Sequence, residues 1–203
     1  MIAIVDYGMG NLRSVQKALE RVGGQTQITH AAAAILNADK VVLPGVGAMA
    51  PAMQKLQELG LVDVLRRVIH EHKPFLGICL GLQLLFDKSA EGGYVQGLKI
   101  LPGTVEKFPV ALRAPKVPHM GWNQIHIQPF GEAMLKGINS GENVYFCHSY
   151  YVKPHDSSIG ATLTNYGIDY VSAIAVNNIW GVQFHPEKSQ AVGLKILENF
   201  IKI

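Results

Sequence analysis

The sequence has few cysteines and no long hydrophobic run. Its two cysteines, Cys79 and Cys147, are too few for the disulfide framework of a small secreted domain, and they fit a reducing compartment. The longest apolar stretch, residues 75–86, is too short to cross a bilayer, and Asp6 interrupts the first apolar run before a signal peptide could form. We therefore expect a cytoplasmic protein without a membrane or targeting segment.

Neither sign of charge is in large excess. The formal net charge is +3, and the chain has no long run of basic residues. Proteins that bind nucleic acids usually concentrate Lys and Arg on one face or along one helix. The composition therefore predicts no nucleic-acid partner.

The signatures of a cofactor or a metal site are weak. Gly8 and Gly10 follow the first predicted strand, but Arg13 stands where a dinucleotide-binding motif has its third glycine. His70 and His72 lie two apart in a helical segment, so they point in different directions and suit no metal ion. The histidines near turns and strand ends, which are His30, His126 and His155, are expected at the surface. We expect no cofactor and no metal.

What the chain does contain is an alternation of apolar strands with amphipathic helices. This pattern predicts a parallel sheet covered by helices on both faces, followed after Gly92 by mostly β structure. The predicted strands are 2–5, 26–29, 40–44 and 74–78; the predicted helices are 11–22, 49–72 with a break near Gly60, 80–89, and 189–203. Between residues 2 and 44, both β-α-β-β and β-α-β-α-β fit.

The length of the chain favours one domain over residues 1–203. We expect an α/β fold with a central, mostly parallel sheet flanked by helices and an added antiparallel β section. The proline-rich stretch 108–122 is expected to be a loop.

The segment Gly77-Ile78-Cys79-Leu80-Gly81 joins a buried strand to a helix. A nucleophile elbow has this form, because glycines on both sides allow the close backbone approach that a sharp turn requires. An elbow places its side chain at a helix N-terminus, where a thiolate is favoured over a thiol. The alternative is a buried cysteine whose glycines serve tight packing between helix and sheet.

A base for Cys79 is found in the segment "GVQFHPEKS", residues 181–189. In an extended chain, His185 and Glu187 project to the same side, so the carboxylate can orient the imidazole toward a nucleophile. The alternative is a strand terminus with an exposed ion pair. Together with the elbow cysteine, these residues predict a Cys79, His185 and Glu187 triad.

Acyl transfer also requires hydrogen-bond donors for an oxyanion. The Leu80 N–H follows the nucleophile directly, and the segment "LPGVGAM", residues 43–49, is a glycine loop that brings the N–H of Val46 or Gly47 close to a substrate. The alternative for this loop is a simple turn from strand to helix.

The segments "PGVG", "GICLGLQLLF" and "GVQFHPEKS" occur in the order and with the separations of the class I, or triad, glutamine amidotransferases, which this sequence resembles over essentially its whole length. The segments "DYGMGNLRSV", "PHMGWNQI" and "YFCHSYY" are similar to those of the glutaminase subunits of imidazole glycerol phosphate synthase, from histidine biosynthesis. The resemblance implies a flavodoxin-like amidotransferase fold.

The resemblance also implies roles for individual residues. Cys79 would attack the side-chain amide of glutamine, His185 would move the proton, and Glu187 would hold His185. The residues expected to contact the glutamine are Gly45, Gln83, Ser149 and Tyr150, and those expected at the oxyanion are Val46, Gly47 and Leu80, with the Gly47 loop needing reorganisation before it donates.

A partner is implied in the same way: a (β/α)₈-barrel cyclase subunit that receives the ammonia. The residues expected near that interface are Asn11, Trp122, Tyr145 and Lys188. From the residues alone, Trp122 is equally well a core or loop anchor and Lys188 a solvated charge. Cys147 is expected in the core and not as a second nucleophile.

Three alternatives remain at this stage. The same triad serves other synthases, in sugar amidation or pyridoxal phosphate synthesis. A cysteine hydrolase or peptidase also uses an elbow of this kind. The third is an interaction module of flavodoxin-like fold with a vestigial triad.

Overall fold

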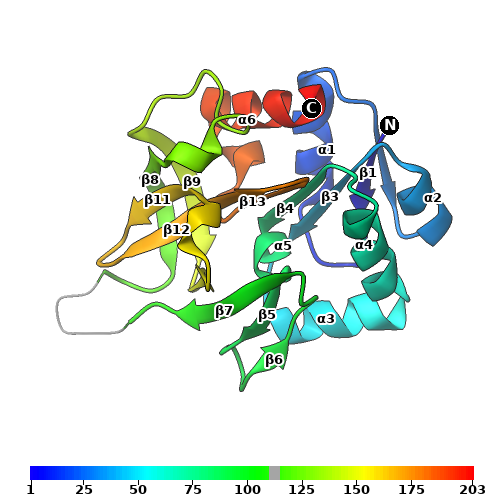
Figure 1. Cartoon of the computed structure of the whole chain (residues 1–203), viewed down its shortest axis with the longest axis horizontal. Coiled ribbons are helices and arrows are strands. Elements are labelled where there is room, and N and C mark those ends of the chain that lie inside the picture. The colour runs from blue at the N-terminus through cyan, green and yellow to red at the C-terminus, as the bar shows by residue number, and fades with distance from the viewer. Residues whose placement is uncertain (110–114) are drawn as a thin grey trace.

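A parallel sheet lies at the centre of the molecule (Figure 1). The structure is a computed structural model that describes residues 1–109 and 115–203. The parallel strands pair in the order β2, β1, β3, β4 and β13, with the bounds Thr26–Thr29, Ile2–Val5, Lys40–Gly45, Phe75–Cys79 and Ile179–Val182. Successive residues of a strand face opposite sides, and in β1 Ala3 and Val5 pack into one apolar cluster while Ile2 and Ile4 pack into another. Because both faces are apolar, both must be covered.

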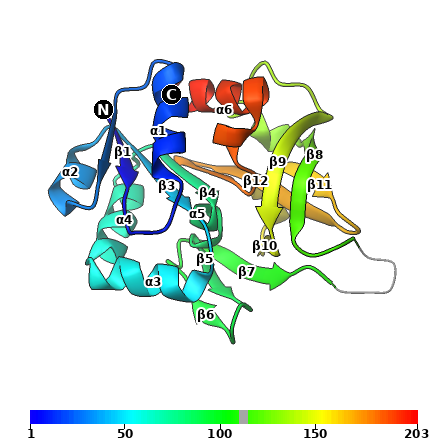
Figure 2. The same ribbon diagram turned by 180° about the vertical axis from the view of Figure 1, so that it is seen from behind.

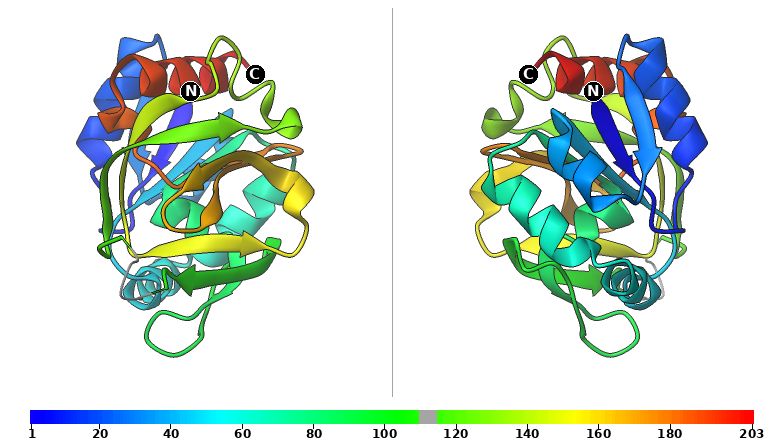
Figure 3. Two further views of the ribbon diagram at one scale, coloured as in Figure 1. Left: turned by 90° about the vertical axis from the view of Figure 1, so that its left-hand side faces the viewer. Right: turned by 90° about the vertical axis from the view of Figure 1, so that its right-hand side faces the viewer.

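Helices cover the two faces separately. Helices α1 (Leu12–Arg21) and α6 (Gln190–Lys202) lie together on one face, and α2 (Ala32–Asn37), α3 (Met49–Glu58) and α4 (Leu61–His70) lie on the other (Figure 3). The predicted break between α3 and α4 is confirmed at Gly60, whose φ of 65° is a left-handed conformation that glycine adopts easily. Helix α2 settles the open choice in favour of β-α-β-α-β. The described helices are all too short or too polar to cross a bilayer.

An antiparallel section extends the sheet beyond β13. Strand β12 (Asp169–Val176) pairs antiparallel with β13 and then contacts two branches, which lie on the side of the molecule away from α2 (Figure 2). One branch holds β10 (Tyr150–Pro154), β7 (Leu101–Lys107), β5 (Phe86–Ser89) and β6 (Val95–Gln96); the other holds β11 (Gly160–Asn165), β8 (His119–Ile127) and β9 (Glu142–His148). Residues 1–109 and 115–203 also form three short 3₁₀ helices: η1 (Pro129–Gly131), η2 (Ser157–Ile159) and η3 (Pro186–Lys188). The expected fold class is confirmed.

Two local predictions were wrong. The segment 80–89 is not mainly helical, because α5 ends after four residues at Gln83 and the chain enters β5 at Phe86. Backbone hydrogen bonds from Leu98 to Leu84 and from Ile100 to Leu85 replace the bonds that a longer helix would form. The predicted loop 108–122 is strand from His119 onward, since β8 pairs with β9 there; residues 110–114 of that loop lie outside the described residues.

The two glycines of the elbow are required by close backbone contacts. A Cβ on Gly81 would lie 1.8 Å from the carbonyl oxygen of Leu43 in β3, and one on Gly77 would lie 2.7 Å from the carbonyl oxygen of Gly81. Helix α5 therefore packs directly on the strands beside it. Tight packing and a sharp turn, which the sequence offered as alternatives, occur together here.

Replacing Gly81 with alanine should therefore destabilise the fold, because the new methyl group meets backbone that cannot move aside. We expect Gly81→Ala to lower the free energy of unfolding by about 3 kcal/mol or more, measured by urea denaturation. Gly10→Ala is the matched control, since its Cβ would lie 3.3 Å from the flexible end of Leu12. Equal stability of the two variants would contradict this account of the elbow.

Candidate active site

A cavity of about 290 Å³ opens where β3 and β4 end. Carboxyl ends of parallel strands are the usual site of ligand binding in α/β folds, because the loops that follow the strands converge there. Residues from five separate parts of the chain form the wall: Val46, Gly47, Cys79, Leu80, Gln83, Glu91, Pro118, Cys147, His148, Ser149, Tyr150, His185 and Lys188.

Cys79 stands at the bend of the elbow. Its φ of 54° and ψ of −107° are unusual for a residue with a side chain, and such strain is typical of a nucleophile elbow. The thiol is almost fully buried, and Sγ lies 4.0 Å from the carbonyl oxygen of Cys147. The side chain of Cys147 is itself half-buried in the cavity wall, so its expected place in the core was wrong.

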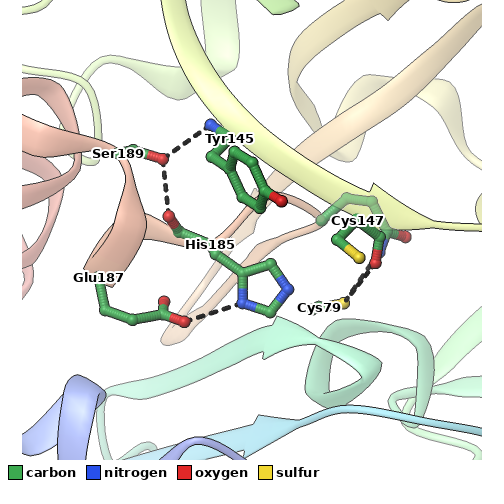
Figure 4. Close-up of polar contacts among 7 residues, drawn as sticks. Cys79, Tyr145, Cys147, His185, Glu187 and Ser189 are labelled. Carbon is green, nitrogen blue, oxygen red and sulfur yellow. Dashed lines mark hydrogen bonds and ion pairs between the residues drawn. The ribbon is translucent and has the colours of Figure 1, made fainter. Parts of the chain in front are cut away.

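His185 lies between Glu187 and Cys79 (Figure 4). Its Nδ1 is 2.9 Å from the carboxylate of Glu187, and its other ring nitrogen is on the side of Cys79. The expected contact forms, but the predicted reason for it was wrong. Strand β13 ends at Val182, and Glu187 approaches the imidazole through the tight turn of η3.

Backbone contacts fix that turn. The His185 N–H donates to the carbonyl oxygen of Tyr145 at 2.9 Å, and the Ser189 hydroxyl donates to the carbonyl oxygen of His185 at 2.6 Å. The Ser189 oxygen also accepts from the Tyr145 N–H at 3.0 Å (Figure 4). Strand β9 and η3 therefore hold the imidazole in one position.

The charge on His185 depends on its two neighbours. Burial alone would lower the pKa of His185, but a hydrogen bond to Cys79 and one to Glu187 outweigh burial and raise the pKa to about 10. The second oxygen of Glu187, Oε2, is buried and has no hydrogen-bond partner among the described residues. Among the described residues, His185 is therefore the hydrogen-bond partner of this carboxylate. The arrangement favours an imidazolium beside the sulfur of Cys79, and an imidazolium is the neighbour that activates cysteine nucleophiles.

The predicted oxyanion residues lie beside the thiol. Leu80 is the first residue of α5, and N–H groups in the first turn of a helix have no partner within the helix. Val46 and Gly47 line the cavity from the loop after β3, and Gly47 has a φ of 93°. Gly45 is buried beneath this wall, where an added Cβ would meet the Tyr7 hydroxyl at 2.3 Å.

Of the four residues expected to contact glutamine, Gln83, Ser149 and Tyr150 line the cavity, and Gly45 does not. The Gln83 amide nitrogen donates to the carbonyl oxygen of Tyr150 at 2.9 Å and to Oε1 of Gln183 at 3.0 Å. The amide nitrogen of Gln83 is thus fully used, and its oxygen is the atom left for a ligand. Ser149 and Tyr150 lie next to it in the wall.

Three of the predicted interface residues form one exposed cluster. The Trp122 and Tyr145 rings are 6.0 Å apart in an edge-to-face arrangement, and the Lys188 ammonium lies 5.6 Å from the Tyr145 ring centre. Trp122 is 49% exposed, so it is not a core anchor. Asn11 is exposed ahead of α1, a helix that contacts η3.

Several residues of the site were missed by the sequence reasoning. His148 is a buried polar residue at the end of β9, and Gln183 is a buried polar residue directly after β13. Glu91 accepts a hydrogen bond from the Met49 N–H at 2.8 Å, which caps α3. His119 is buried as well, with its ring stacked on Tyr166 at 3.8 Å. The only sequence signal for these buried polar residues was their position as single polar residues inside apolar runs. The expected surface histidines, His30, His126 and His155, are exposed.

No cluster of three or more metal-ligating side chains occurs in the part of the chain that the structure describes.

The sequence model of the family "Glutamine amidotransferase class-I" matches residues 3–203. The chain belongs to this family. A protein of Syntrophotalea carbinolica named imidazole glycerol phosphate synthase subunit HisH is 52% identical over 204 residues, covering 98% of each chain. The HisH protein of Aquifex aeolicus is 53% identical over 198 residues, covering 97% of this chain and 94% of that one.

Solved structures show the same fold at low sequence identity. A glutamine amidotransferase crystal structure aligns with a TM-score of 0.75 and 16% identity, covering 98% of this chain and 99% of that one. The CTPS glutaminase domain of Trypanosoma brucei, determined with bound acivicin, aligns with a TM-score of 0.67 and 15% identity over 99% and 93% of the two chains.

The two buried histidines should make stability depend on pH. Burial lowers the pKa of His119 to about 4 and that of His148 to about 3, from an ordinary value of 6.5. The unfolded chain therefore binds more protons, so stability is complete above about pH 6.5 and falls toward pH 4 by about 1.4 kcal/mol per pH unit for each histidine. His185, whose pKa is raised to about 10, acts in the opposite direction near pH 6.5 and above, because the folded protein keeps a proton there that the unfolded chain loses; below about pH 5.5 it is protonated in both states.

Urea denaturation at pH 7 and pH 5 measures this effect. Between the two values, His148→Gln should lose about 2 kcal/mol less stability than the unchanged protein. His126→Gln, which removes an exposed histidine, should behave like the unchanged protein. The same pH dependence in all three proteins would contradict a neutral buried His148.

Proposed function

We propose that this chain is the glutaminase subunit of an imidazole glycerol phosphate synthase. It hydrolyses glutamine to glutamate and ammonia and passes the ammonia to a cyclase subunit. The observation that carries the proposal is the contact of His185 with Glu187 beside the strained Cys79, in a chain 52% identical to a HisH protein. The family match over residues 3–203 supports treating the whole chain as one glutaminase domain.

The reaction begins with the thiolate of Cys79. It attacks the side-chain amide carbon of glutamine, and the oxyanion accepts hydrogen bonds from the Leu80 N–H and, after the loop reorganises, from the N–H of Gly47 or Val46. Protonated His185 donates its proton to the departing nitrogen, so ammonia leaves and a γ-glutamyl thioester remains. Glu187 keeps the imidazole in place during both steps.

Water completes the cycle. His185, now neutral, takes a proton from water, which attacks the thioester carbon and releases glutamate and the thiolate. The α-amino group of the substrate is a cation and requires acceptors, which the Gln83 oxygen and the Glu91 carboxylate supply from the cavity wall. Ser149 and Tyr150 offer backbone groups beside them.

The partner explains how ammonia is used. At neutral pH free ammonia is mostly ammonium, which is not a nucleophile, so transfer inside a docked complex preserves its reactivity. We assign the docking surface to the cluster of Trp122, Tyr145 and Lys188, with Asn11 at its margin. Lys188 belongs both to this cluster and to the cavity wall, so the partner would cover the cavity mouth. A cytoplasmic location remains the expectation.

Glutamate release tests the proposal. The pure protein should release glutamate slowly. Adding a (β/α)₈-barrel cyclase of histidine biosynthesis with its ribotide substrate should increase the rate of glutamate release. Cys79→Ala should remove at least ~10³ of the stimulated rate. Cys147→Ser should retain most of it, because only one thiol is the nucleophile. Release without any response to the cyclase would refute the partner assignment, and an active Cys79→Ala variant would refute the triad.

Truncating the exposed tryptophan tests the docking surface. Trp122→Ala should weaken cyclase binding at least tenfold, because aromatic anchors usually carry a large part of the binding energy. Its glutaminase rate without cyclase should not change. Tyr94→Ala, which removes an exposed aromatic ring from another part of the surface, is the control. Isothermal titration calorimetry with the cyclase distinguishes them, and equal affinities would place the interface elsewhere.

A further inference from the structure

Gln183 is a fully buried amide directly beside the nucleophile. Its exposed fraction is 0%, and it follows β13 between Val182 and Phe184. A buried amide must be hydrogen-bonded, since an unpaired one costs free energy. Its Oε1 lies 3.0 Å from Nε2 of Gln83, and its Nε2 lies 3.7 Å from Sγ of Cys79.

The carbonyl oxygen of Tyr150 sets the direction of these hydrogen bonds. A carbonyl can only accept, so the Gln83 atom that lies 2.9 Å away must be its NH₂ group. The second N–H of that group points at Gln183, which must therefore present its oxygen. The remaining end of Gln183, which faces sulfur, is the N–H donor.

A second chain of donors converges on the same carbonyl. His148 donates from Nδ1 to the Tyr150 oxygen at 2.8 Å, which leaves its Nε2 to accept from the Tyr170 hydroxyl at 3.3 Å. The Tyr170 oxygen in turn accepts from Nδ1 of His119 at 3.1 Å. Asn123 closes the chain by donating to Nε2 of His119 at 3.2 Å. Every group in this chain is neutral, and each hydrogen bond has a single possible donor. The Tyr150 carbonyl oxygen accepts from both Gln83 and His148, so both of its lone pairs are used.

We propose that Gln183 is a positioning residue for the nucleophile, which donates an N–H to the sulfur of Cys79 with a direction imposed by the Tyr150 carbonyl through Gln83. Sγ has the carbonyl oxygen of Cys147 on another side, a contact that a thiol tolerates and a thiolate does not. The contact with Gln183 has the opposite preference, because a donor binds a charged sulfur more strongly than a neutral one. Gln183 thus favours the thiolate of Cys79 and fixes its position, and this effect is independent of His185.

The substitution Gln183→Glu tests this contact with little change in shape. The new side chain still offers an oxygen to Gln83, but it presents a carboxylate oxygen where the sulfur had a donor. Alkylation of Cys79 by iodoacetamide at pH 7 should slow at least about tenfold, and its pH profile should move to higher pH. Peptide mapping by mass spectrometry reports Cys79 and Cys147 separately, so Cys147 serves as the internal reference. Gln96→Glu, which places the same charge at an exposed position, should alkylate like the unchanged protein.

The inference rests on the proposed function only in naming Cys79 as the nucleophile, and alkylation needs no glutamine, so the two can fail separately. In the glutaminase assay, kcat should fall about 10²-fold with KM nearly unchanged, as for loss of one donor to a developing charge. Gln183→Met removes the donor without adding charge and provides the test if the glutamate variant does not fold. Unchanged alkylation of Cys79 in a folded variant of either kind would overturn the proposal.

Discussion

The close approach of α5 to β3 is the contact on which the site depends. With the carbonyl oxygen of Leu43 only 1.8 Å from where a Cβ of Gly81 would be, helix and strand touch through their backbones. The chain between β4 and α5 has no room for a gradual turn, so Cys79 takes a positive φ and its thiol emerges at the crest. The loop after β3 and the segment after β13 end at the same edge, because both strands are parallel to β4 and adjacent to it. Strand order therefore brings His185 and Gly47 to the thiol.

Two buried histidines near this thiol are held in opposite charge states. The hydrogen bonds of His185 to the thiol and to Glu187 raise its pKa by more than burial lowers it, so His185 is charged. His148 has only a carbonyl and a hydroxyl as partners and stays neutral. Of these two histidines, only His185 is therefore an imidazolium, which is the charge state that the proposed acid role requires. A second imidazolium beside the first would lower the pKa of His185 and so reduce the fraction of His185 that carries a proton. The neutral chain of Asn123, His119 and Tyr170 keeps His148 in the form that this requires.

The cavity and the exposed aromatic cluster are joined by one residue. Lys188 lines the cavity and also lies over Tyr145, which is hydrogen-bonded through its backbone to His185 and Ser189. A partner seated on Trp122 and Tyr145 would thus press on the same β9 and η3 segments that hold the imidazole. In the proposed complex, docking, closure of the cavity mouth and placement of the base would depend on the same part of the structure.

Local patterns in the sequence determined the parallel half of the sheet, the break at Gly60, the elbow and the choice of the three residues proposed as the triad, since each depends on neighbours in the chain. The end of α5, the start of β8 and the route by which Glu187 reaches His185 were decided by tertiary pairing, which replaced helix or extended chain with contacts to distant strands. Gln183 and His148 gave no periodic signal. Their roles depend on partners far away in sequence, with Gln83 and Gln183 being 100 positions apart. Only the folded chain decides which buried polar group donates and which accepts. The direction of these hydrogen bonds is set by the Tyr150 carbonyl, which can only accept, and the sheet brings its donors to it.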